Sequence, residues 1–424
     1  MNAFVVQLRR GPGLWITPAM VLAGAALALS QLQALTVWSE SSSAAANSPY
    51  VMGAFVAGGG SWLSVQARRR GTLQVDQLSA RGPAAAAAVD MGALAVWALV
   101  AYGLVAAIVL VPTAFRATWG GPAWLWLAES GVGLVAFVPL GWGLGRLAPS
   151  RFTPFAVAVL AFATAVFWDS SPRTYWWWHR LFPALQWIQR PFDEPRALPL
   201  VGQILWYLGI GAAVLAIVAV TGRDSARRTR ALAAVACLLV AGGAGIAAST
   251  ESGHVVFAEL GVHREMVCAG DEPVVCVHPA YRDTLPQVQE RFTPIVQRLA
   301  GTPFAVHRAV QQPREDLAYL TPGATGFGLD WATSTYVDIA AEDLVRNALY
   351  GTAACDLSSA DLSIGLDPYR VVEVWAFGEG QVLDPHAKQA LTWLSGLDGP
   401  GARTWLTSHA GQIRACTLAY SDFS

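Results

Sequence analysis

The chain has 424 residues, a formal net charge of −1 and a mean hydropathy of +0.41, and only 13% of its residues are charged. Soluble domains carry about 25% charged residues, so this composition excludes an ordinary soluble globular protein. Residues 1–250 carry 17 Arg and 8 Asp or Glu, whereas residues 251–424 carry 11 Arg or Lys and 21 Asp or Glu. We therefore expect a basic, apolar first part in a membrane and an acidic, water-soluble second part.

One class of enzyme is excluded by the near absence of lysine. The only lysine is Lys388, which stands in Asp-Pro-His-Ala-Lys-Gln-Ala. A phosphate-binding P-loop needs a Gly-rich turn followed by Lys and then Ser or Thr. The chain therefore does not hydrolyse ATP by that machinery.

Seven apolar segments are candidates for membrane-spanning helices, each of which needs about 20 mostly apolar residues. The second segment contains Gly58-Gly59-Gly60, which loosens a helix or lets another backbone approach closely. The predicted spans are residues 14–37, 50–66, 91–112, 124–144, 152–168, 198–220 and 231–249.

The loops between these spans alternate in charge. Up to residue 250, one side of the membrane receives 12 arginines and the other receives five. Because positively charged loops stay in the cytoplasm, we expect a cytoplasmic N-terminus. Seven spans then place residues 251–424 outside a bacterial cell (inner) membrane. We interpret the first span as a retained helix, because it is long and lacks a clear signal-peptide cleavage site.

The segment between the second and third spans begins with Arg68-Arg69-Arg70 and ends with Gly82-Pro83. Its centre is short and amphipathic, with apolar Leu73, Val75 and Leu78. A helix lying on the cytoplasmic face would present its polar side chains to a partner protein. The alternative is a plain basic loop that anchors at lipid headgroups.

The sequence Arg69-Arg70-Gly71-Thr72-Leu73, followed by Leu78-Ser79-Ala80, resembles the same loop in permease subunits of type 2 ABC exporters. The similarity extends to the plan of the first 220 residues, which includes a basic segment before span one and an amphipathic loop between spans five and six. The seventh span and the outer tail depart from that family's minimal plan.

The resemblance implies a six-span permease that works as a dimer, with an identical or related permease subunit. It also implies a separate cytoplasmic ATPase subunit, which would bind the ATP and Mg that this chain does not. The segment that would couple to this ATPase comprises Thr72, Leu73, Gln74, Asp76, Gln77 and Leu78.

Two features near the predicted outer surface are candidates for a substrate gate. The loop 171–190 contains Trp176, Trp177 and Trp178, and it is too polar to span the membrane. We interpret it as an interfacial or re-entrant helix, which either anchors the chain or touches an amphiphilic substrate. Glu129 lies near the outer end of the fourth span, where it either reaches lipid headgroups or forms part of a site.

Residues 251–424 are enough for one domain with its own core. A hairpin is expected at 264–277, helices at 281–300, 342–350, 359–364, 369–377, 385–397 and 402–419, and strands at 303–310 and 333–339. The fold class is thus an α-helical polytopic membrane protein with a C-terminal extracytoplasmic α+β domain.

Four of the five cysteines lie in this domain, where an oxidising compartment favours two disulfides. Cys268 and Cys276 flank the predicted hairpin turn, which leaves Cys355 to pair with Cys416, and Cys237 in the seventh span is expected to be free. Metal binding by Cys268, Cys276 and His278 is the alternative.

These observations predict three domains: a six-span permease at 1–225, a seventh helix at 226–250 and a disulfide-containing outer domain at 251–424. We expect no enzyme activity, no metal and no nucleic-acid partner. The predicted function is ATP-driven export or extraction of an amphiphilic lipid, peptide or antibiotic. A membrane-anchored receptor or assembly protein, whose outer domain binds a ligand, is the alternative.

Overall fold

The computed structural model describes most of the chain, and it divides into two compact units, Met1–Leu260 and Gly261–Ser424. We call them the N-terminal unit and the C-terminal unit. The described residues are 3–32, 37–69, 82–170, 192–220, 235–236, 239–240, 242–243, 257–259, 266–312, 324–329, 333–351, 368–378 and 384–424.

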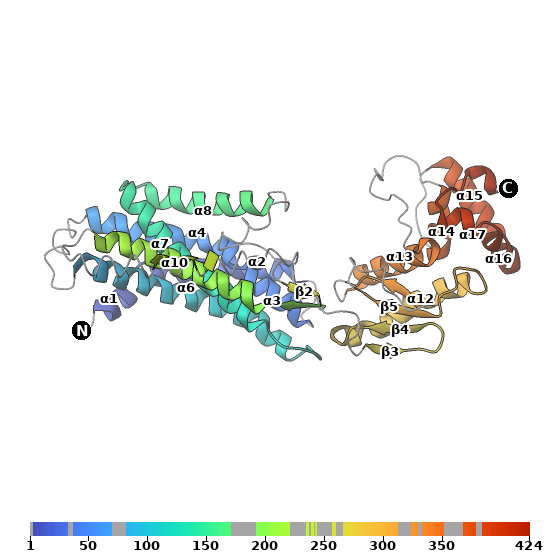
Figure 1. The fold of residues 1–424 in the computed structure, drawn as a ribbon, viewed down its shortest axis with the longest axis horizontal. Coiled ribbons are helices and arrows are strands. Elements are labelled where there is room, and N and C mark those ends of the chain that lie inside the picture. The colour runs from blue at the N-terminus through green and yellow to red at the C-terminus, as the bar shows by residue number, and fades with distance from the viewer. Residues whose placement is uncertain are drawn as a thin grey trace. The chain divides into compact units, whose positions relative to one another are not determined.

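The N-terminal unit is helical, and its long helices run alongside one another (Figure 1). Within the described part of the chain, four segments are long and apolar enough to cross a membrane: α2, residues 85–114 of α6, α7, and residues 197–217 of α10. Residues 153–167 of α8 are apolar but shorter. These helices are compatible with the predicted polytopic membrane protein. The helices are α1 (Ala3–Arg10), α2 (Gly13–Gln31), α3 (Trp38–Asn47), α4 (Pro49–Arg69), α6 (Gly82–Ala114), α7 (Trp124–Leu147), α8 (Thr153–Ser170) and α10 (Ala197–Val220).

The first predicted span is too long at its C-terminal end. Helix α2 ends at Gln31, and a separate helix, α3, begins at Trp38 in the predicted loop after the first span. Helix α3 has the sequence Trp-Ser-Glu-Ser-Ser-Ser-Ala-Ala-Ala-Asn, and every residue after the tryptophan is buried. The sequence predicts no helix at residues 38–47, because a serine-rich segment has no apolar face.

Helices α4 and α7 pack through small residues. A methyl group added at Gly141 of α7 would overlap the backbone carbonyl of Ala57 on α4, and one added at Gly60 of α4 would overlap the carbonyl of Val138. Gly145 lies against Ser61 and Ser64 in the same way. Such close backbone approach is typical of helix packing in membranes. The expectation that the glycine run admits another backbone is thus confirmed.

After α10 the chain runs back along the same helix. Leu239 lies against Gly209 of α10, and Gly242 lies against the backbone of Trp206. Leu239 and Gly242 therefore follow α10 in the antiparallel direction. Further on, β2 (Phe257–Glu259) pairs antiparallel with β1 (Asp193–Pro195), which stands just before α10. Residues 257–259 are therefore at the same end of α10 as residues 193–195.

The C-terminal unit contains a four-stranded sheet with strand order β3-β4-β5-β6. Strands β3 and β4 form the predicted antiparallel hairpin, whereas β4, β5 and β6 are parallel. The elements are β3 (Val267–Ala269), β4 (Val274–Val277), η2 (Pro279–Thr284), α12 (Leu285–Leu299), β5 (Arg308–Gln311), β6 (Ala324–Phe327), α13 (Ser334–Tyr350), α14 (Pro368–Phe377), α15 (Pro385–Gly396), α16 (Gly399–Ser408), α17 (Ala410–Arg414) and η4 (Tyr420–Asp422).

Helix α12 packs its apolar side against this sheet. Its predicted apolar side is buried, and Phe292 packs edge-on against Phe327 of β6 with ring centroids 4.9 Å apart. Two other expectations are wrong. Residues 333–339 form the start of helix α13, not a strand, and the predicted helix 402–419 is divided at His409 into α16 and α17.

Candidate functional site

A group of polar side chains lies inside the N-terminal unit, where α6, α7 and α10 meet. We call it the polar layer; it consists of Tyr102 on α6, Glu129 and Ser130 on α7, and Tyr207 on α10. Glu129 is only 8% exposed and Tyr207 only 2%. The Ser130 hydroxyl donates a hydrogen bond to Glu129 Oε2 at 3.3 Å, and the Tyr207 side chain also hydrogen-bonds Glu129. The layer thus joins three helices around one carboxyl group.

Tyr102 joins the layer through a hydrogen bond to the backbone of α7. Its hydroxyl donates to the backbone carbonyl of Leu127 at 3.0 Å, which fixes α6 against the first turns of α7. The Tyr102 ring lies against Gly131, where a side chain would press on it. The aromatic ring therefore stands beside the turn of α7 that carries Glu129.

Apolar clusters enclose the polar layer along α7. Toward the beginning of the helix, Trp126 and Leu127 pack with Leu110 of α6 and Leu200 of α10. Further along, Leu134 belongs to a second apolar cluster with residues of α2, α4 and α6. Because the carboxyl group lies between these two clusters, Glu129 is surrounded by helices. This placement disfavours contact with lipid headgroups.

No basic side chain neutralises Glu129 among the residues that the structure describes; its contacts are with hydroxyl groups. An ionised carboxyl group within a bilayer is costly, and such groups usually pair with an opposite charge or mark a functional pathway. The polar layer is therefore the strongest candidate site in the N-terminal unit. A role for Glu129 in a substrate gate stays a prediction.

Helix α3 adds a second polar region to the same unit. The Ser41 hydroxyl lies 2.6 Å from the Thr113 hydroxyl near the end of α6, and Ser42 Oγ accepts a hydrogen bond from the backbone N–H of Ala123, just before α7. Asn47 donates to the Gln31 side chain at the end of α2. These bonds give Ser41, Ser42 and Asn47 hydrogen-bond partners inside the protein, and they tie together the ends of α2, α6 and α7.

Two of the other predicted sites lie outside the described residues. The proposed coupling segment, with Thr72, Leu73, Gln74, Asp76, Gln77 and Leu78, lies outside them, as do Trp176, Trp177 and Trp178. Both remain predictions from the sequence alone.

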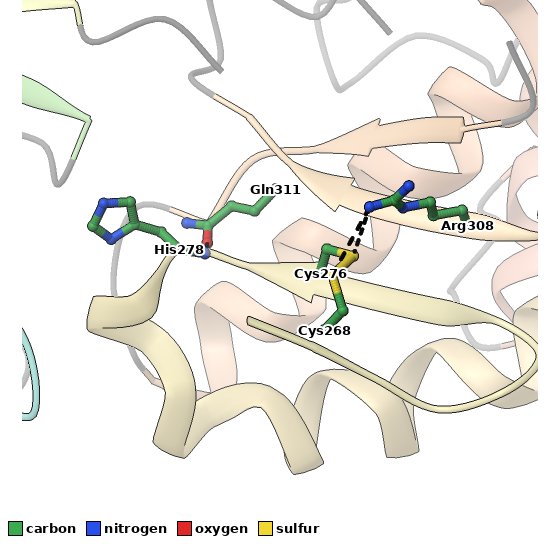
Figure 2. Close-up of a disulfide and its surroundings, with 5 residues drawn as sticks. All are labelled: Cys268, Cys276, His278, Arg308 and Gln311. Atoms are coloured by element: carbon green, nitrogen blue, oxygen red, sulfur yellow. Dashed lines mark hydrogen bonds between the residues drawn. A yellow bond between two sulfur atoms is a disulfide. The ribbon is translucent and has the colours of Figure 1, made fainter. Parts of the chain in front are cut away.

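One predicted disulfide is confirmed in the C-terminal unit. Cys268 and Cys276 are directly opposite each other on β3 and β4 and form a disulfide. Figure 2 shows Arg308 of β5 extending toward the sulfur atoms, with its Nη2 3.5 Å from Cys276 Sγ. Cys416 is also disulfide-bonded. Its pairing with Cys355 stays a prediction, because Cys355 lies outside the described residues, as does Cys237.

The neighbouring histidine has a structural role. The backbone N–H of His278 donates to Gln311 Oε1 at 2.8 Å, and Gln311 Nε2 donates to the carbonyl of Leu329 at 2.9 Å. One amide side chain at the end of β5 thus links the ends of β4 and β6 (Figure 2). His278 Nδ1 accepts from the Ala280 N–H. Since Cys268 and Cys276 bond to each other, the metal-site hypothesis for these residues is wrong.

A partly buried charge cluster joins α13 to α14. Arg346 lies 3.6 Å from Glu373 and 3.5 Å from Glu342. Burial raises the pKa of Glu373 above its usual value, although Arg346, Tyr350 and Arg370 act in the opposite direction. Burial also raises the pKa of Tyr350, and the carboxyl group of Glu373 adds to that effect. Because the cluster joins two helices, we interpret it as structural.

No protein-family model, curated protein or solved structure matches this chain. The site is therefore interpreted from its own residues. Sequence analysis singled out Glu129, because a charge interrupts an apolar run, but it missed Tyr102, Ser130 and Tyr207. Tyrosine and serine are common in apolar helices, and only the packing of α6, α7 and α10 brings these three together.

Proposed function

We propose that this chain is the permease subunit of an ATP-driven transporter that exports or extracts an amphiphilic molecule. The observation that carries the proposal is the polar layer, in which Glu129 lies buried between three helices long and apolar enough to cross a membrane. A chain whose helices served only as a membrane anchor would not need a buried carboxyl group between them that no basic side chain of the described residues neutralises.

The N-terminal segment and the loop 66–83 support a separate ATPase as the power source. Helix α1 is a short helix that ends in Arg9 and Arg10, and the Trp97 indole on α6 donates to the Leu8 carbonyl at 2.8 Å. A basic helix before the first span belongs to the plan of the exporters that this sequence resembles. In that plan the segment 72–78 docks on the ATPase, and a second permease subunit completes the pathway.

The return of the chain along α10 supports seven spans and an external C-terminal unit. Because β1 pairs with β2, a chain that crosses the membrane in α10 has to cross again before residue 257. The contacts of Leu239 and Gly242 with α10 fit such a crossing by residues 231–249. Together with the split of arginines in the loops, this supports the proposal that residues 261–424 lie outside the membrane. Protease added to intact spheroplasts should remove this unit, whereas full protection would mean an even number of spans.

Two variants of the loop test the link to an ATPase. Leu78→Asp should release the ATPase from the purified complex while the permease stays inserted, because an apolar anchor in a small contact commonly contributes about 1–4 kcal/mol. Replacing Arg68, Arg69 and Arg70 by glutamine should instead disturb the topology. Co-purification and a topology reporter distinguish the two. A normal complex and normal transport in the Leu78→Asp variant would contradict the proposal.

A membrane-anchored receptor or assembly protein is the second candidate. The C-terminal unit favours it, since this unit has its own sheet and its own apolar core around Phe292. The two functions differ in their dependence on Glu129. A receptor should keep its ligand when Glu129 is replaced, whereas a permease should lose transport.

A further inference from the structure

The charge of the polar layer indicates what kind of molecule it can hold. Its one ionisable acid is Glu129, and the hydroxyl groups of Ser130 and Tyr207 bind to that carboxyl group. No arginine, lysine or histidine of the described residues pairs with it. Among the described residues, an anionic headgroup would therefore meet a carboxyl group and oxygen atoms without a paired positive charge to offset the repulsion. The layer is chemically suited to a cation.

We propose that the polar layer binds the protonated amine of an amphiphilic molecule, with Glu129 as the counter-charge; this rests on the proposed transport function. A buried carboxyl group accepts short hydrogen bonds from an ammonium group. The hydroxyl groups of Ser130 and Tyr207 hold the carboxyl group in place for this contact. Tyr102 and Tyr207 are buried, at 7% and 2% exposure, so they act in surroundings from which water is largely excluded.

The surroundings of the layer indicate the rest of the ligand. The cluster of Leu110, Trp126 and Leu200 lies on one side along α7, and Leu134 and Phe137 belong to the cluster on the other side. A small, fully hydrated cation gains nothing from such walls, whereas an alkyl chain does, at about 0.8 kcal/mol for each buried CH₂ group. The predicted ligand therefore joins one amine to an apolar chain.

Entry of this ligand requires helix movement, because Glu129 is buried in the described conformation. The residues of the layer come from three different helices, so a shift of α10 away from α7 separates Tyr207 from Glu129 and opens the carboxyl group. A transporter that alternates between closed and open states needs such a change. The polar layer is thus the part of the N-terminal unit where ligand binding is coupled to helix movement.

The test uses the full chain in phosphatidylcholine nanodiscs and three probes: decylammonium, decanol and methylammonium. Binding is measured by calorimetry and by the shift in thermal unfolding. Decylammonium should bind the natural chain, and Glu129→Gln should weaken that binding at least tenfold. Decanol should bind both chains equally, because it has the alkyl chain without the charge. Methylammonium, which has the charge without the chain, should bind at least tenfold more weakly than decylammonium.

Matched variants separate a direct role from a loss of folding. Tyr207→Phe keeps the ring and removes the hydroxyl group, so it should weaken decylammonium binding about threefold. Glu129→Asp keeps the charge and should bind more tightly than Glu129→Gln. Asp90→Asn removes an acid elsewhere on α6 and should leave binding unchanged. If Glu129→Gln does not fold, decylammonium binding by Glu129→Asp and by Tyr207→Phe still tests whether the amine binds at the polar layer.

Two results would overturn the inference. Equal decylammonium binding by the natural chain and by Glu129→Gln would mean that the amine lies elsewhere, in the lipid or on the surface. Methylammonium binding as tight as that of decylammonium would mean a site for small cations. Neither result bears on the ATPase, since co-purification with the Leu78→Asp variant tests that link independently.

Discussion

In the N-terminal unit Trp15 of α2 is 79% exposed and Phe155 of α8 is 76% exposed, while the serine-rich helix α3 and Glu129 are buried. In the C-terminal unit the arrangement is reversed: Phe292 and Ile295 are fully buried, and most charged side chains lie at the surface. The interior of each unit also differs in how it is packed. Small residues bring backbones together in one, and large aromatic and aliphatic side chains fill the other.

This difference is the one expected if lipid surrounds the N-terminal unit and water surrounds the C-terminal unit. In lipid there is little gain from burying another apolar side chain, so helices associate by close backbone packing and by polar contacts. In water the burial of apolar surface is the main driving force, and α12 provides it with one apolar side. Both units thus have apolar clusters inside, but the N-terminal unit also buries polar side chains and packs its helices through small residues. Single substitutions can test each kind of packing separately.

The largest effect is expected for Phe292→Ala in the C-terminal unit. The ring is fully buried against Phe327, and removal of a buried phenylalanine costs about 3–5 kcal/mol of folding free energy. Hydrogen exchange of the full chain should show faster exchange in α12 and in the sheet, and unchanged exchange in α6 and α7. Faster exchange in both units would mean that they do not unfold independently.

Loss of the hairpin disulfide should have the next largest effect. Replacement of both Cys268 and Cys276 by serine opens a loop with a sequence separation of 8. The chain-entropy estimate for such a loop is about 2–3 kcal/mol. Hydrogen exchange of β3 and β4 measures the change, and Cys237→Ser, in the predicted seventh span, is the control. An unchanged hairpin would show that the sheet holds β3 without the covalent link.

Gly141→Ala tests the close backbone packing of the N-terminal unit. Alanine normally favours a helix over glycine, but a methyl group here overlaps the Ala57 carbonyl, so we expect a loss of about 1–3 kcal/mol. Gly143, on the same helix, has no atom near its added methyl group, and Gly143→Ala should be neutral or stabilising. Thermal unfolding of the detergent-solubilised chain compares the two. Similar behaviour of both variants would contradict the packing argument.

The smallest effect is expected for Glu373→Gln, and it should depend on pH. Because burial raises the folded-state pKa of Glu373, the folded protein binds this proton more tightly than the unfolded protein does. The stability linked to Glu373 therefore falls as pH rises above its unfolded value of 4.5. Glutamine removes this loss, so the stability of the variant relative to the natural chain should increase as the pH rises from 4 to 8.

Hydrogen exchange in α13 and α14 across this pH range measures the difference. Glu342→Gln is the matched control, since Glu342 pairs with the same arginine but is about half exposed. A Glu373→Gln variant with the same pH dependence as the natural chain would show that Arg346 fully offsets the burial of the acid.

Much of the fold could be predicted from the sequence, because most elements have a local signal. The apolar runs locate α6, α7 and α10, and Gly270-Asp271-Glu272-Pro273 locates the hairpin. Helix α3 has no such signal, because Ser41 and Ser42 form hydrogen bonds with Thr113 and Ala123, which are distant in the sequence. Residues 333–339 contain Thr, Tyr, Val and Ile, which favour a strand, but they fold as part of the longer helix α13.

The candidate site could be predicted only in part. A charge in an apolar segment marks Glu129 without any knowledge of the fold. Its partner Tyr207 lies in another apolar segment, with nothing in the sequence to distinguish it from a tyrosine that faces lipid. The helix register that joins them depends on packing of α10 against α7, and that is a property of the whole unit.

The short antiparallel pair of strands β1 and β2 also has a mechanical consequence. Strand β1 ends at Pro195, and α10, the helix that carries Tyr207, begins at Ala197. Strand β2 ends at Glu259, directly before the boundary of the C-terminal unit. If α10 tilts or slides to open the polar layer, its first turn pulls on β1, and the ladder passes that force to β2. Movement of α10 would therefore also displace residues 257–259, which are distant from this helix in the sequence but paired with the strand directly before it.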